Sequence, residues 1–131
     1  MIDLLVSCLA DAGDGILVAK PFYNGFSASF ECRNEVIPVG VELVEGSEAG
    51  LCAIGAFEKA LLESERNGVQ IRAIMLCNPN NPLGFCYSKE VLLASRSTAP
   101  TLEPKPLTLL GDQAYCRFVE KHNLHLIVDE I

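Results

Sequence analysis

The sequence predicts an α/β fold, arranged as three α/β/α layers around a mostly parallel sheet. Short apolar runs alternate with amphipathic helical patterns along the 131 residues, and this alternation is typical of right-handed βαβ units. Hydrophobic residues make up 50% of the chain, which excludes a disordered class. Two of the apolar runs end directly on polar side chains. Open α/β sheets bind ligands outside the carboxyl ends of their strands, so those side chains indicate a pocket.

The first half of the chain is expected to form one helix, two strands and a turn. Ile2–Ala12 has apolar residues at helical spacing, and Gly13 follows as a stop signal. Ile16–Ala19 is typical of a short buried strand, and Pro21–Phe26 of a turn. Val36–Val41 is the second strand, and the proline within it indicates a sheet edge or a bulge.

The second half is expected to form three helices and two strands. The helix Ala53–Asn67 ends at an Asn-Gly pair in the manner of a C-cap. The strand Ile71–Leu76 follows, and a short helix covers Glu90–Ala94. A helix from about Gln113 to His122 then leads into the strand Leu124–Val128.

Residues 95–112 do not fit this alternation. They carry three prolines and show neither helical nor strand periodicity. Unstructured connections beyond about 15 residues are uncommon in compact domains. We therefore expect an irregular, proline-rich insertion within one ancestral amphipathic helix. Intron sequence read through by a gene model is one origin, which sequencing of the mature transcript would test.

Charge and hydropathy exclude two classes of partner. The formal net charge is −7, and no cluster of Lys or Arg offers a footprint for nucleic acid. No apolar run approaches the length of a membrane span. The run near the N-terminus has Asp3 where a signal peptide would carry its basic region. We expect no nucleic-acid partner and no membrane association.

The six cysteines form no C-x-x-C pair. Cysteines in apolar patterns behave as small buried hydrophobes, which favours a reduced, intracellular setting. Four fit this description: Cys8, Cys52, Cys77 and Cys116. The cluster Cys116, His122 and His125 is split between a predicted helix and a predicted strand, so no metal site is expected.

Four motifs in order carry a family resemblance. They are CLADAGD (Cys8–Asp14), VAKPFYNGF (Val18–Phe26), NPNNPLG (Asn78–Gly84) and HLIVDEI (His125–Ile131). This set resembles the fold-type-I pyridoxal-phosphate enzymes, and most closely the 1-aminocyclopropane-1-carboxylate synthase-like branch of the class I/II aminotransferases. The resemblance implies that residues 1–131 are part of the large cofactor-binding domain. It also implies a cytoplasmic, homodimeric transferase or lyase whose small-molecule substrate is an α-amino acid.

The resemblance further assigns three cofactor contacts. Pyridoxal phosphate works as an electron sink, which requires a protonated pyridine nitrogen. Asp129 is the carboxylate that would favour this cationic ring. Asn81 would donate to the ring hydroxyl oxygen, with Asn78 as a cap of the loop. Tyr23 would stack on the ring face.

Each contact also has a purely structural interpretation. Asp129 could be a solvated acid at a strand end or a helix N-cap. Asn81 could be a turn residue, because Asn-Pro often initiates turns. Tyr23 could be half-buried packing against its aromatic neighbours.

No catalytic residue is assigned to this chain. In the family, the lysine that carries the cofactor follows the Asp-containing strand. It is matched by none of the five lysines: Lys20, Lys59, Lys89, Lys105 and Lys121. The glycine-rich phosphate-binding turn and the arginine that binds the substrate carboxylate are not matched either. Three hypotheses remain: part of an active enzyme, a non-catalytic relative, or a mispredicted or truncated gene-model fragment with no independent role. An isolated copy of the chain would expose unpaired sheet edges, so we expect it to be poorly soluble or molten.

Overall fold

The computed structural model describes residues 1–42, 53–84 and 112–130. Its described strands form one sheet with the order β2-β1-β3-β4, and every neighbouring pair is parallel. The strands are β1 (Gly15–Lys20), β2 (Ile37–Glu42), β3 (Ile71–Asn78) and β4 (His125–Glu130). The predicted parallel sheet is confirmed.

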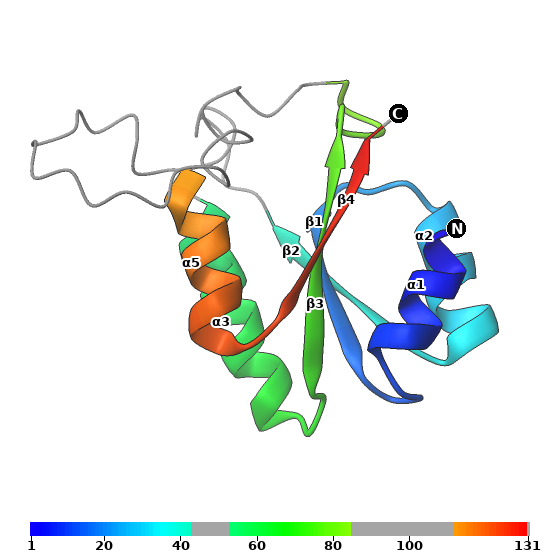
Figure 1. Cartoon of the computed structure of the whole chain (residues 1–131), viewed down its shortest axis with the longest axis horizontal. Helices are drawn as coiled ribbons and strands as arrows, with labels where there is room; N and C mark the ends of the chain where they lie inside the picture. The colour runs from blue at the N-terminus through cyan, green and yellow to red at the C-terminus, as the bar shows by residue number, and fades with distance from the viewer. Residues whose placement is uncertain (43–52, 85–111, 131) are drawn as a thin grey trace, which may run out of the picture.

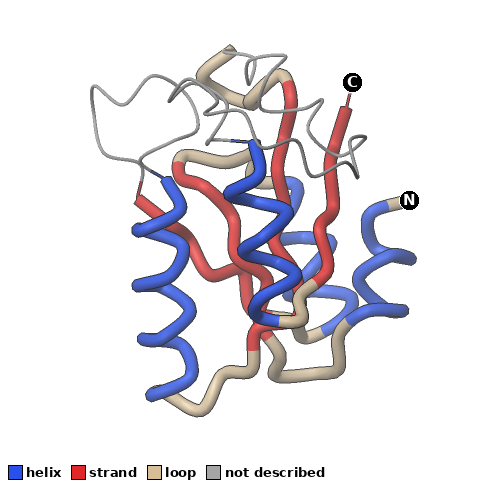
Figure 2. Tube along the Cα trace, turned by 60° about the vertical axis from the view of Figure 1, so that its left-hand side comes forward, coloured by secondary structure: helices blue, strands red, loops and turns tan. Residues whose placement is uncertain are grey.

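Helices cover both faces of this sheet (Figures 1 and 2). On one face lie α1 (Ile2–Leu9), α2 (Gly25–Ser27) and the π-helical turn η1 (Ala28–Cys32). On the other face lie α3 (Ala53–Arg66) and α5 (Asp112–His122), side by side. The three-layer α/β/α architecture is therefore confirmed.

Each face of the sheet has its own apolar core, because successive strand residues point to opposite faces. Under α3 and α5 the core consists of Leu17, Ala19, Val41, Phe57, Leu61, Ile71, Ile74, Leu76, Tyr115 and Phe118. Under α1, α2 and η1 it consists of Val6, Ile16, Val18, Phe26, Phe30, Val36, Ala73, Met75, Cys77 and Ile127. We call the second set the α1-side core.

Most predicted elements are confirmed, with ends shifted by a few residues. The helix predicted over Ile2–Ala12 ends at Leu9, because Ala10 is already extended, with φ −139° and ψ 145°. The proline of Val36–Val41 does lie in an edge strand of the described sheet, since β2 is outermost. The predicted helix Glu90–Ala94 lies outside the described residues. So does the predicted insertion, apart from Asp112, which begins α5.

A turn was predicted over Pro21–Phe26 and no element over residues 27–35, but α2 and η1 form there. Glycine and serine obscure the helical pattern there. A signal was nevertheless present, because Phe22, Phe26 and Phe30 recur at intervals of four. Their rings stack in the structure, with centroids 6.5 Å and 6.0 Å apart.

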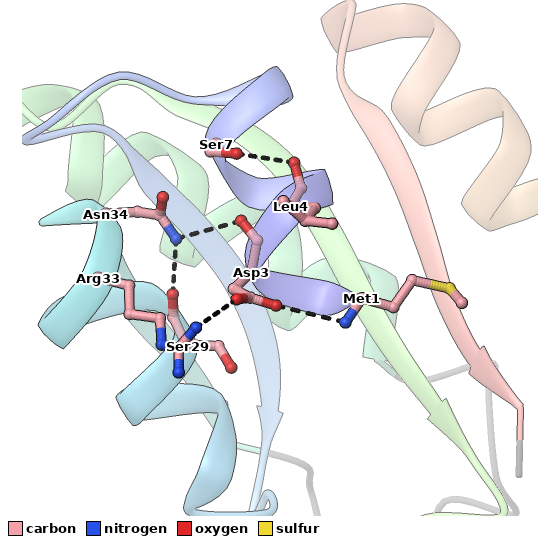
Figure 3. A network of polar contacts seen from close by, with 7 residues as sticks. All are labelled: Met1, Asp3, Leu4, Ser7, Ser29, Arg33 and Asn34. Carbon is pink, nitrogen blue, oxygen red and sulfur yellow. Dashed lines mark hydrogen bonds and ion pairs between the residues drawn. The ribbon is translucent and has the colours of Figure 1, made fainter.

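Polar contacts fasten α1 to the end of this helical segment (Figure 3). An oxygen of the Asp3 carboxylate lies 2.7 Å from an Arg33 guanidinium nitrogen. The Asn34 side-chain amide donates to the carbonyls of Asp3 and Ser29, at 3.3 Å and 2.7 Å. The network holds the helices on the α1 side of the sheet together. Tyr23 lies two residues before the first residue of α2.

The cysteine expectations hold only in part. Cys77 is buried as predicted and Cys116 is half-buried, but Cys8 is exposed on α1. Cys8 lies on the outward face of its helix, whereas Val6 is the buried residue of that helix. Cys52 lies outside the described residues.

Candidate functional site

The carboxyl ends of three neighbouring strands carry the three predicted contact residues. Tyr23 follows β1, Asn81 follows β3, and Asp129 lies at the end of β4. These strands are adjacent and parallel in the order β1-β3-β4, so their ends share one edge of the sheet. In Figure 1 the arrowheads of β3 and β4 end beside each other. The topology therefore brings the three segments together at the carboxyl end of the sheet.

Asp129 pairs across the sheet with Cys77 of β3. It is half-buried and shares its strand face with Ile127, a member of the α1-side core. The Cys77 sulfur lies 3.9 Å from the Asp129 Oδ2. Asp129 is therefore in contact with the neighbouring strand on the face that carries α1 and α2.

Asn81 lies in the tight turn that follows β3, and its side chain is exposed. The neighbouring Asn80 is only 4% exposed. The Asn80 Oδ1 accepts the backbone N–H of Leu83 at 3.2 Å, and its carbonyl accepts that of Gly84 at 2.7 Å. Asn80 thus caps the loop. Asn78, which the sequence predicts as a cap of the loop, is the last residue of β3. Asn81 is left facing outward.

Tyr23 packs edge-on against Phe26, with ring centroids 5.7 Å apart and an interplanar angle of 88°. Phe26 belongs to the same α1-side core as Cys77. The Tyr23 ring also lies over Gly25, where an added Cβ would come within 2.2 Å of the ring. Tyr23 is 48% exposed. Its ring is therefore fixed by the contact with Phe26, while much of its surface faces solvent.

The lysines of the described part are all engaged in ion pairs. Each forms an ion pair on the surface: Lys20 with Glu42 at 3.1 Å, Lys59 with Glu63 at 3.8 Å, and Lys121 with Glu58 at 2.7 Å. The described ranges also hold no group of three or more His, Cys, Asp or Glu that could bind a metal. None of the helices in those ranges is both long enough and apolar enough to span a membrane.

The sequence interpretation missed Cys77 as a site residue. It was classed as a small buried hydrophobe, yet its sulfur contacts Asp129. The signal that could have found it is its place one residue before the end of the strand that leads into NPNNPLG.

Comparison with known proteins identifies the family. The profile of the family "Aminotransferase class I and II" matches residues 1–123. The human "probable inactive 1-aminocyclopropane-1-carboxylate synthase-like protein 2" is 33% identical, over 97% of this chain and 20% of its own length. "Probable aminotransferase sirI" of Leptosphaeria maculans is 32% identical, over 99% of this chain and 26% of its own length.

Solved structures share the fold. The alanine aminotransferase from Pyrococcus furiosus superimposes with a TM-score of 0.69 at 23% identity, over 99% of this chain and 26% of that one. The PLP-bound C-S lyase from Staphylococcus hominis also gives 0.69, at 20% identity, over 99% of this chain and 27% of that one. The chain spans about a fifth to a quarter of the length of these proteins. By its sequence and its fold, the chain belongs to the aminotransferase class I and II family.

Proposed function

We propose that this chain is part of a pyridoxal-phosphate-dependent enzyme acting on an α-amino acid, either an aminotransferase or a 1-aminocyclopropane-1-carboxylate synthase-like lyase. Residues 1–131 would form part of its large cofactor-binding domain. The family match over residues 1–123 supports this. The observation that carries it is the placement of Tyr23, Asn81 and Asp129 at the carboxyl ends of three adjacent parallel strands.

The residues at this edge fit pyridoxal phosphate chemically. When bound, the cofactor supplies an electron sink for the negative charge that develops at the α-carbon of the substrate. The half-buried Asp129 carboxylate offers an anion for the protonated ring nitrogen and keeps that proton in place. The outward Asn81 amide offers a donor for the ring hydroxyl oxygen. The Tyr23 ring offers a flat face that restricts the tilt of a stacked heterocycle.

The wider setting follows from the same proposal. The substrate would be an α-amino acid, and the enzyme would be a cytoplasmic homodimer without nucleic-acid or membrane partners. The net charge of −7 supports the absence of a nucleic-acid partner. Sedimentation of the full-length protein, and its distribution after cell fractionation, would test the dimer and the compartment.

A second candidate is a non-catalytic relative that keeps only the cofactor-binding fold. It is favoured by the human relative, whose name calls it probably inactive. The ion-paired lysines of the described part also support it. Sequencing the transcript beyond Ile131 separates the two candidates. An in-frame S-x-x-K segment would favour the enzyme, and its absence from the mature message would favour the non-catalytic relative.

The proposed contacts can be tested with pyridoxamine 5′-phosphate. This analogue has an amine in place of the aldehyde, so it cannot attach to surface lysines. Binding to the 131-residue chain is followed by the fluorescence of the analogue. Asp129→Asn and Asn81→Ala should each weaken binding, Asp129→Asn by about tenfold or more, because a hydrogen bond to a charged group is worth about 1.5–3 kcal/mol.

Glu130→Gln is the matched control, because this exposed neighbour on β4 alternates to the opposite face of the strand. It should bind the analogue as the wild type does. Equal affinities of Asp129→Asn and Glu130→Gln would contradict the assignment of Asp129.

A further inference from the structure

Cys77 lies between the two polar groups that the proposed function uses. It is 6% exposed and is the penultimate residue of β3. Its sulfur lies 3.3 Å from the carbonyl oxygen of Pro79 and 3.9 Å from the Asp129 Oδ2. One side chain thus contacts both the turn that carries Asn81 and the carboxylate of Asp129.

These contacts suit a thiol. The single S–H proton can be donated to the Pro79 carbonyl, which closes the turn back onto the strand end. The sulfur also lies beside Asp129, which is the Cα partner of Cys77 on the neighbouring strand β4. The sulfur therefore fills the space that separates the turn from the carboxylate.

The thiol stays protonated in this position. Burial raises the pKa of Cys77, the Asn81 N–H lowers it, and the nearby Asp129 raises it, with a net increase. A neutral thiol beside Asp129 adds no second negative charge at the edge of the sheet. It therefore leaves the Asp129 carboxylate as the anion available to a cationic ring.

We propose that Cys77 is a positioning residue of the cofactor site. Through the Pro79 carbonyl, its sulfur fixes the turn that carries Asn81 relative to the Asp129 carboxylate, so that both contacts meet one ligand in a set geometry. This proposal rests on the proposed function. It differs from the sequence interpretation, in which Cys77 only filled the core.

The test uses two substitutions in the 131-residue chain and one control. Cys77→Val keeps an apolar side chain but removes the hydrogen bond to the Pro79 carbonyl, whereas Cys77→Ser keeps a donor. Cys116→Ser is the matched control, since Cys116 is a half-buried cysteine of α5 on the other face of the sheet. Two quantities are measured. One is the hydrogen-exchange rate, by NMR, of the Gly84 amide, which donates to the Asn80 carbonyl within the turn. The other is the affinity for pyridoxamine 5′-phosphate.

We expect Cys77→Val to speed exchange at the Gly84 amide by roughly tenfold, because the turn loses its hydrogen bond to the end of β3. The same variant should bind pyridoxamine 5′-phosphate about fivefold to tenfold more weakly, which corresponds to a lost hydrogen bond. Cys77→Ser should restore most of both quantities, and Cys116→Ser should match the wild type. A purely structural residue would not show this rescue by a smaller polar side chain.

Two results would overturn the positioning function. One is wild-type exchange and affinity in Cys77→Val. The other is a loss in Cys77→Ser as large as that in Cys77→Val, which would indicate packing alone. If the wild-type chain does not bind the analogue, the cofactor proposal fails for this chain. The exchange rates of Gly84 in the two variants then still decide whether the thiol holds the turn.

Discussion

Asp14 is a buried acid at the opposite end of the sheet from the candidate site. It is 8% exposed. Its Oδ2 lies 2.7 Å from the Arg72 Nε and accepts the backbone N–H of Asp11 at 3.0 Å. Arg72 is the extra residue of a bulge, because Ile71 and Ala73 pair with consecutive residues of β1. The bulge lets the guanidinium reach Asp14, which joins the starts of β1 and β3.

This pair predicts acid-sensitive stability. Burial alone would raise the pKa of Asp14. The hydrogen bonds from Arg72 and Asp11 together lower this pKa by more than burial raises it, so the net direction is downward. A carboxyl whose pKa is lowered on folding stabilises the fold above its unfolded value of about 3.9, and this contribution is lost as the pH falls through the folded value. Asp14→Asn should therefore lower the free energy of unfolding by about 1–3 kcal/mol at pH 7.

Urea titrations of both proteins between pH 7 and pH 3 measure this difference. It should stay constant down to about pH 5 and shrink below about pH 4. Asp11→Asn is the control, because Asp11 supplies its backbone N–H to Asp14 and its own side chain is exposed. A gap between wild type and Asp14→Asn that stays the same at pH 3 would argue against the ion pair as its source.

Gly25 offers a second test at the scale of one residue, because the Tyr23 ring occupies the space that a Cβ would need. The added carbon would lie 2.2 Å from the Tyr23 Cε1, so Gly25→Ala should move the ring. If Tyr23 stacks on the cofactor, this variant should bind pyridoxamine 5′-phosphate more weakly, with a changed tyrosine signal in near-UV circular dichroism.

Gly55→Ala serves as the control for this variant. A Cβ at Gly55 meets nothing within 4 Å, and alanine in the helix α3 should stabilise it by up to about 1 kcal/mol. Gly55→Ala should leave binding unchanged. Unaltered binding in Gly25→Ala, together with a changed tyrosine signal, would indicate that Tyr23 is packing rather than a ligand contact.

At the scale of elements, the sequence predicted what depends on local pattern. The four described strands and the helices α1, α3 and α5 follow from periodicity and stop signals. The positions of Asn81 and Asp129 at the ends of two apolar runs placed them at the carboxyl end of the sheet. The contact of Cys77 with Asp129 could not be predicted in this way. It depends on which strands become neighbours, and these residues are 52 positions apart in the sequence.

The docking of α5 on α3 should depend on aromatic burial rather than on charge. Phe57 of α3 is fully buried and meets Tyr115 of α5 edge-on, with ring centroids 5.6 Å apart. Phe57→Ala should cost about 3–5 kcal/mol of stability, as is usual when a core aromatic is truncated. The adjacent Glu58 forms an exposed pair with Lys121, and exposed pairs contribute little.

Glu58→Gln is therefore the control on the same helix, and it should leave the urea midpoint nearly unchanged. Thermal and urea unfolding of both variants measure the two effects. A Glu58→Gln loss comparable to that of Phe57→Ala would mean that the ion pair, rather than the buried rings, holds α5 to α3.

At the scale of the whole molecule, the described sheet has two outer strands, β2 and β4. Outer strands present unpaired backbone groups that can pair with another chain. Large apolar side chains are also exposed in the described part, namely Met1, Leu4, Leu5, Tyr23, Ile37, Leu62, Leu83 and Val128. Since the chain matches only about a fifth to a quarter of its relatives, these surfaces are where the isolated chain should associate.

We expect the isolated 131-residue chain to self-associate through β4, and Val128→Lys to weaken this association. Val128 is 40% exposed on that outer strand, and a charged side chain on an edge opposes strand pairing. The association constant from sedimentation equilibrium should fall by about tenfold, or about 1.4 kcal/mol. Leu62→Lys makes the same change in net charge at an apolar residue of α3 that is 46% exposed, and it should have a smaller effect. A chain that stays monomeric at high concentration, with a cooperative melt and persistent near-UV dichroism, would contradict this expectation, because the outer strand would then need no partner.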